Sequence, residues 1–221
     1  MAIIPASTGE LPGVIPIFPL RGALLLPRGK LPLNIFEPRY LAMIEAALAG
    51  PRLIGMIQPK VKETLEAGDH PDLYDVGCAG KITTFAETDD GRYLITLTGL
   101  CRFRVRAELE LKNGFRRMRV DFAPFGRDLA GAGDEGAIDR EALLETIKAY
   151  LEHRELSADW EAITKTRTGD LVSVMSMVCP FSPIEKQALL EAADGADRAA
   201  TMISLMEMDR ATDDEPPGAV N

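Results

Sequence analysis

The chain has 221 residues, of which 46% are hydrophobic and 27% charged, and its formal net charge is −9. This composition is ordinary for a globular protein of one or two domains with a buried core, and no apolar run approaches the ~20 residues of a membrane-spanning helix. Cys78, Cys101 and Cys179 are too few and too scattered for a disulfide framework. The first ten residues lack the basic and apolar regions of a signal peptide, so we expect a cytoplasmic protein that does not interact with membranes.

The negative charge is unevenly distributed along the chain. Residues 1–126 carry sixteen Lys and Arg against fourteen Asp and Glu, whereas residues 127–221 carry nine against twenty. A near-neutral first part and an acidic second part indicate two structural units. Because nonspecific binding to nucleic acid requires a basic surface, the net acidity also makes nucleic acid an improbable partner.

Residues 1–13 are expected to form a flexible leader, followed by two apolar runs that contain prolines. The runs are Ile15–Leu20, with Pro16 and Pro19, and Leu31–Phe36, with Pro32. Proline cannot donate to a β-ladder, so these strands must place their prolines at sheet edges, strand ends or bulges. Pro38 then opens a helix, and the apolar residues that follow keep helical spacing until Gly50.

The next segments alternate in the way β-strands do. Residues 53–58 form a compact apolar run that predicts a buried strand, and residues 59–74 are charged and predict a loop. Residues 76–87 and 92–98 flank Thr88-Asp89-Asp90-Gly91, and this Asp-Gly pair predicts a hairpin. From Cys101 to Arg106 and again from Arg117 to Phe122, polar and apolar residues alternate with a period of two. Residues 14–125 are therefore predicted to form a small closed or half-closed β-barrel with one inserted helix.

The hydrophobic period becomes helical after a predicted linker at residues 126–137. Residues 138–211 predict five helices, the first capped by Asp139 and the fourth opened by the capping box Ser182-Pro183-Ile184-Glu185. Residues 212–221 are acidic and are expected to form a disordered tail.

Five sequence blocks within residues 14–105 resemble the amino-terminal, substrate-binding domain of Lon proteases. They are I-P-I-F-P-L-R (15–21), L-P-L-N-I-F-E-P-R-Y (31–40), L-I-G-M-I (53–57), D-L-Y-D-V-G-C-A-G-K-I (72–82) and G-L-C-R-F-R-V (99–105). The remainder of the chain is similar to the helical extension of small stand-alone bacterial proteins of this family. The resemblance implies an α+β fold, in which a PUA-like β-rich pseudo-barrel precedes a helical bundle.

The sequence contains no complete catalytic or metal-binding motif. The sequence has no G-x-x-x-x-G-K-[ST] nucleotide-binding loop. Ser182 and Lys186 could be considered as a peptidase dyad, but Ser182 is better explained as a helix cap. His70 and His153 are interpreted as solvated surface residues, and the cysteines lack the paired spacing of zinc ligands. We therefore expect no enzymatic activity, no metal and no cofactor.

Two sets of residues are candidates for recognition. Short strands broken by prolines leave an edge that could accept an extended peptide, and the apolar side chains near this edge would contact the side chains of the peptide. The alternative is that Phe36 and Tyr40 are core residues. This first set is Leu24, Leu25, Leu26, Phe36, Arg39 and Tyr40. The second set is a predicted arginine face for anions or RNA, consisting of Arg102, Arg104, Arg106, Arg117 and Arg119. The alternatives for this face are pairing with Glu108, Glu110 and Asp121, or docking onto the acidic helical part.

The expected function, implied by the resemblance, is non-catalytic binding of polypeptide segments or of a partner protein, and the resemblance suggests a place in protein quality control. The alternative is an RNA- or nucleotide-binding module that uses the face of Arg102, Arg104 and Arg106.

Overall fold

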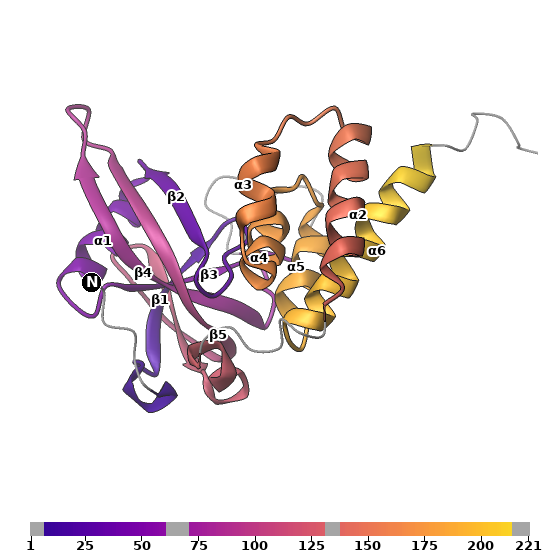
Figure 1. Cartoon of the computed structure of the whole chain (residues 1–221). Coiled ribbons are helices and arrows are strands. Elements are labelled where there is room, and N and C mark those ends of the chain that lie inside the picture. The colour runs from indigo at the N-terminus through magenta and orange to yellow at the C-terminus, as the bar shows by residue number, and fades with distance from the viewer. Residues whose placement is uncertain (1–6, 61–70, 131–137, 214–221) are drawn as a thin grey trace, which may run out of the picture.

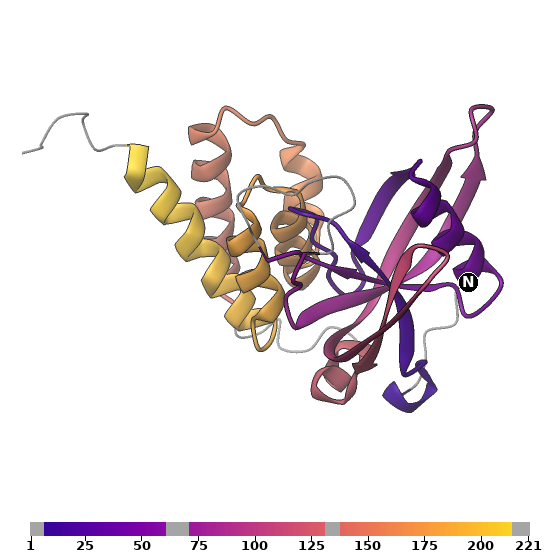
Figure 2. The ribbon, with the colours of Figure 1, turned by 180° about the vertical axis from the view of Figure 1, so that it is seen from behind.

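The protein consists of a β-rich part and a helical part that diverge from a common junction, as Figure 1 and the reverse view in Figure 2 show. The structure is a computed structural model, and residues 7–60, 71–130 and 138–213 are described. All six strands of the described chain lie before residue 122, and the helices α2 to α6 lie after residue 139. The mixed α+β architecture predicted from the sequence is confirmed.

Five strands close into a barrel and a sixth extends one side of it. The sheet order is β2-β5-β4-β3-β1-β6, and an additional pairing of β5 with β6 closes the ring. The strands are β1 (Val14–Pro19), β2 (Lys30–Ile35), β3 (Leu53–Ile57), β4 (Val76–Glu87), β5 (Tyr93–Lys112) and β6 (Phe115–Asp121). The long strand β5 makes this possible, because its first half pairs with β2 and its second half with β6.

The prolines lie where a missing N–H group is tolerated. Pro19 is the last residue of β1, and Pro16 precedes Ile17, where the pairing of β1 with β3 begins. Pro32 lies in β2, which pairs with β5 alone among the described strands. The prediction of sheet edges, strand ends or bulges is confirmed for Pro19 and Pro32, whereas Pro16 lies inside β1 and pairs with Arg117 of β6.

The predicted hairpin joins β4 to β5 and projects beyond the barrel (Figure 1). Gly91 adopts a left-handed φ of +76°, and the Thr88 N–H donates to the carbonyl of Arg92. A left-handed backbone in a tight turn favours glycine, so the Asp-Gly pair has the role inferred from the sequence.

Two clusters of buried side chains form the core. One fills the barrel and includes Ile15, Ile17 and Phe103. The other spans both parts of the protein, with Leu25 and Leu97 on the β side and Tyr150, Leu171 and Met202 on the helical side. Because the second cluster is continuous, the barrel and the helices share apolar surface.

The helices begin and end close to the predicted positions. They are α1 (Pro38–Leu48), α2 (Arg140–His153), α3 (Trp160–Lys165), α4 (Thr168–Val178), α5 (Pro183–Glu191) and α6 (Gly195–Asp213). Asp139 caps α2 by accepting from the N–H groups of Glu141 and Ala142, and Ser182 and Glu185 form the predicted capping box of α5.

Several short segments differ from the sequence-based expectation or fall outside the described residues. The 3-10 helix η2 (Ala123–Leu129) occupies the first residues of the expected linker, and the 3-10 helix η1 (Thr8–Glu10) lies in the expected leader, where Leu11 is buried. The helix α6 extends to Asp213, into the expected tail. Residues 1–6, most of the predicted 59–74 loop, residues 131–137 and residues 214–221 lie outside the described residues.

Candidate functional site

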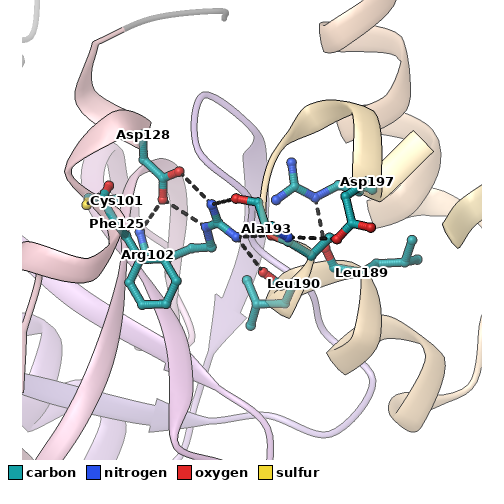
Figure 3. Close-up of polar contacts among 10 residues, drawn as sticks. Cys101, Arg102, Phe125, Asp128, Leu189, Leu190, Ala193 and Asp197 are labelled. Atoms are coloured by element: carbon teal, nitrogen blue, oxygen red, sulfur yellow. Dashed lines mark hydrogen bonds and ion pairs between the residues drawn. The ribbon is translucent and has the colours of Figure 1, made fainter. Parts of the chain in front are cut away.

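Arg102, one of the residues of the predicted arginine face, is buried at the junction of the two parts, and only 4% of it is exposed. Its Nε and Nη2 donate to the two carboxylate oxygens of Asp128 at 3.0 and 2.9 Å. Its Nη1 donates to the carbonyls of Leu190 and Ala192 at the end of α5 (Figure 3). Such a bidentate, charge-assisted arrangement fixes geometry strongly. Arg102 therefore joins the barrel to the helices and does not belong to an exposed anion site.

The other predicted arginines do not form a continuous basic surface. Arg106 pairs with Asp121 at 2.5 Å, and Arg117 donates to the carbonyl of Glu110. Arg104 and Arg119 have exposed side chains. The pair of Arg106 with Asp121 matches the alternative of pairing with an acidic residue. The contacts of Arg102 match the alternative of docking, because the acceptors of Arg102 belong to η2 and to the helical part.

Most of the residues predicted to bind a peptide lie in the core. Leu24, Leu25 and Leu26 are buried because the segment that carries them packs against β5, where a Cβ on Gly99 would collide with the Leu26 carbonyl. Tyr40 packs on Phe18 with ring centroids 4.4 Å apart, and burial raises its pKa. The prediction that these four residues read a peptide at the surface therefore does not fit the structure.

Phe36 and Arg39 are the two predicted peptide-binding residues that are accessible. The side chain of Phe36, directly after β2, is 62% exposed. Arg39 pairs with Glu37 at 2.8 Å and lies over the ring of Tyr40 at 4.6 Å. An accessible phenylalanine thus stands at the end of the edge strand.

The strand β2 presents one side to β5 and the other away from the sheet. The Gly99 N–H donates to the Gly29 carbonyl, and the register continues without a shift from Lys30↔Thr98 to Ile35↔Tyr93. Hydrogen-bonded pairs alternate along an antiparallel ladder. The backbone N–H and C=O groups of residues 31, 33 and 35 therefore face β5, and those of residues 30, 32 and 34 face away from the sheet. The outer edge therefore offers the N–H groups of Lys30 and Asn34 and three carbonyls, and Pro32 falls at an outward position.

A shallow pocket of about 470 Å³ adjoins this edge, and we call it the edge pocket. All of the described residues that line it are uncharged: Pro32, Leu33, Asn34, Thr84, Phe85, Ala86, Leu94, Ile95 and Thr96. Leu94 is 46% exposed and Phe85 44%. A neutral, partly apolar surface of this kind favours apolar side chains over charged ones.

Sequence reasoning missed Leu94, Phe85 and Asn34. One signal was available for Leu94, because the alternation of residues 93–98 places this leucine on the same side of the strand as Thr96 and Thr98. A large apolar residue on the polar side of a strand marks a candidate contact surface.

The described residues provide no arrangement typical of a catalytic or metal centre. Ser182 accepts from the Glu185 N–H, and the Lys186 ammonium donates to the carbonyls of Gly22 and Met177. Burial raises the pKa of Cys101 to about 12 and that of Cys179 to about 11, so both thiols are protonated near neutral pH and poorly nucleophilic. Among these residues no group of three His, Cys, Asp or Glu is placed to hold a metal; His70 lies outside them.

The helices of the described chain include none whose length and hydropathy would let it cross a bilayer.

Comparison with known proteins gives one consistent result. The family model of the ATP-dependent protease La (LON) substrate-binding domain matches residues 14–208. Lon protease 2 of Myxococcus xanthus is 26% identical over 91% of this chain and 24% of its own length, and Lon protease 2 of Sorangium cellulosum is 31% identical over 50% and 14%. The chain thus spans about a quarter or less of the curated relatives it matches.

Solved structures agree on the fold. A Lon N-terminal domain protein from Xanthomonas campestris has a TM-score of 0.58 at 21% identity, covering 86% of this chain and 97% of that one. The N-terminal domain of Mycobacterium avium complex Lon protease has a TM-score of 0.64 at 18% identity, covering 88% and 98%.

Proposed function

The chain belongs to the family of the ATP-dependent protease La (LON) substrate-binding domain, and from this premise we propose that it binds extended, uncharged segments of other polypeptides along β2. The backbone of the bound segment pairs with the outer edge of β2, and its apolar side chains enter the edge pocket. The binding is reversible and involves no bond chemistry.

The observation that carries the proposal is the coincidence, on one strand, of an edge that pairs with no described strand and a neutral pocket. Pro32 and Asn34 belong to both, and Leu33 between them also lines the pocket. Addition of a strand to a sheet edge supplies main-chain hydrogen bonds that do not depend on sequence, and an adjoining pocket selects side chains. A surface with both features suits segments of different sequence whose side chains are uncharged and partly apolar.

The composition of β2 limits how tightly and how indiscriminately the edge can pair. Pro32 removes one outward N–H group and Lys30 places a charge at the first outward position, and both are features that discourage edge-to-edge association. The remaining groups allow a short ladder. Main-chain pairing along β2 is therefore weak, and binding also requires apolar side-chain contacts in the edge pocket. This combination favours transient binding of exposed apolar segments over permanent assembly.

A charge placed in the edge pocket tests the proposal. Leu94→Asp should weaken binding of a fluorescein-labelled, reduced and carboxymethylated unfolded protein about tenfold in fluorescence anisotropy, because the bound apolar side chains would desolvate the carboxylate. Leu111→Asp is a matched control, since Leu111 is 48% exposed on the same strand β5 but does not line the pocket. Equal weakening by the two variants, or none by Leu94→Asp, would contradict the assignment of the site.

A further inference from the structure

A second pocket, of about 480 Å³, lies where the start of β4 meets α5, and we call it the junction pocket. Its β side consists of Lys60, Tyr74, Asp75, Val76 and Arg104, and its helical side of Ile184, Gln187, Ala188 and Glu191. It shares no lining residue with the edge pocket. Its volume is within the range of pockets that hold small ligands or a few residues of a peptide.

Gln187 leaves one buried hydrogen-bonding atom without a partner in this pocket wall. Only 3% of this residue is exposed. Its side-chain Nε2 donates to the Val76 carbonyl at 3.2 Å and to the Glu191 carboxylate at 2.6 Å. These two acceptors fix the orientation of the amide, and its Oε1 has no partner among the described residues. A buried unpaired acceptor is unfavourable and rare in native proteins, so the position calls for an N–H or O–H donor.

The rest of the lining combines two cations, Lys60 and Arg104, with two carboxylates, Asp75 and Glu191, and an exposed apolar side chain. Arg104 and Lys60 stand on the β side with exposed side chains. The Glu191 carboxylate already accepts from Gln187. Ile184 in the first turn of α5 is 65% exposed. The pocket therefore offers an acceptor for a backbone N–H, guanidinium and ammonium groups for a carboxylate, and apolar surface for a side chain.

We propose that the junction pocket binds a carboxylate-bearing stretch of polypeptide as a second recognition site, separate from the edge pocket. A backbone N–H of the ligand donates to Gln187 Oε1, its carboxylate accepts from Arg104, and an adjacent apolar side chain contacts Ile184. The carboxylate belongs either to the end of a polypeptide or to an internal acidic residue, and both sources present the same group. Residues from both parts of the protein contact the ligand.

Fluorescence anisotropy of the full chain with three labelled Gly- and Ser-based peptides tests the proposal. The first ends in Leu with a free carboxylate, the second is its C-terminal amide, and the third is an amide with Glu before the Leu. The peptide with the free carboxylate, the Glu-containing amide or both should bind about fivefold more tightly than the neutral amide. Whichever peptide binds identifies the source of the carboxylate. Equal affinity for all three peptides would overturn the proposal.

Variants at the pocket separate this site from other causes of binding. Arg104→Gln should remove the preference for carboxylate peptides, whereas Arg119→Gln, the same change at an exposed arginine outside the pocket, should keep it. Ala188→Leu places a larger side chain in the pocket at an exposed helical position, so it should abolish binding and leave the free energy of unfolding nearly unchanged. Leu94→Asp should leave the affinity for these three peptides unchanged. A failure of the proposal for the edge pocket would therefore be distinguishable from a failure of the proposal for the junction pocket. An ordered water on Gln187 Oε1, with no difference between peptides, would refute the proposal.

Discussion

At the scale of single residues, the buried cysteines couple stability to pH. Cys179 follows the last turn of α4 and is 2% exposed. Burial raises the pKa of this thiol from about 9 to about 11, although the nearby Lys186 lowers it. Folding therefore favours the protonated thiol, and the thiolate form opposes the folded state.

Alkaline pH should destabilise the protein through this residue. The stabilisation is complete below the unfolded-state pKa near 9 and is lost as pH rises through about 11, at a cost of about 3 kcal/mol in the free energy of unfolding. The measurement is urea unfolding at a series of pH values for the wild type and Cys179→Ala. The variant should show a shallower decline between pH 9 and 11; an unchanged slope would contradict the role of Cys179.

At the scale of elements, the direction of each residue in β2 decides what the strand can bind. Leu33 donates its N–H toward β5, whereas that of Asn34 points outward according to the alternation that begins at Gly29 and Gly99. The two neighbouring residues therefore have opposite roles: one holds the strand in the sheet and the other belongs to the proposed binding edge.

Proline substitutions at these two positions separate the roles. Leu33→Pro removes a ladder hydrogen bond and should lower the free energy of unfolding by about 3 kcal/mol or more, whereas Asn34→Pro should lower it by about 1 kcal/mol. Asn34→Pro should nevertheless weaken binding of the unfolded test protein severalfold, because it removes an outward donor. Chemical unfolding and anisotropy measure the two effects. A larger stability loss for Asn34→Pro than for Leu33→Pro would show that the assigned directions are reversed.

At the scale of the whole molecule, a few buried polar residues fix the helices on the barrel. Arg102 joins Asp128 to the end of α5. Gln58 accepts from the Gly22 N–H and donates to the Pro183 carbonyl at 2.8 Å. The Lys186 ammonium donates to the Gly22 carbonyl. Together with the shared apolar cluster, these contacts join the two parts into one packed unit.

Removal of Arg102 should strongly weaken this unit. Arg102→Ala removes the guanidinium from the buried Asp128 carboxylate, which keeps only the backbone N–H of residue 102, and from the carbonyls of Leu190 and Ala192, and we expect a loss of about 3–5 kcal/mol in the free energy of unfolding. Arg106→Ala, which breaks an exposed pair on the same strand, should cost less than about 1 kcal/mol. The measurement is urea unfolding followed by far-ultraviolet circular dichroism and by the fluorescence of Trp160. Similar losses for both variants would contradict the role of Arg102 as the connection.

Predictions from the sequence were most accurate where a local rule acts on a few neighbouring residues. The hairpin at Gly91, the capping box at Ser182 and the prolines of β1 and β2 follow from backbone chemistry that does not depend on distant parts of the chain. The candidate site was less accessible to such reasoning. An apolar run such as Leu24–Leu26 is equally compatible with a core and with a binding surface, and only the packing against Gly99 reveals its burial.

Residue order alone is sufficient to establish the period of each element, the change from strands to helices and the membership of the family. The tertiary structure decided which side chains face water. It placed Arg102 inside, although the strand pattern puts this arginine on the polar side, and it left Leu94 exposed on the side that Leu94 shares with Thr96 and Thr98. The physical reason is that a strand has two faces of equal period, and the burial of each face depends on which distant element covers it. Here η2 and α5 cover Arg102, and Leu94 remains on the uncovered side of the hairpin.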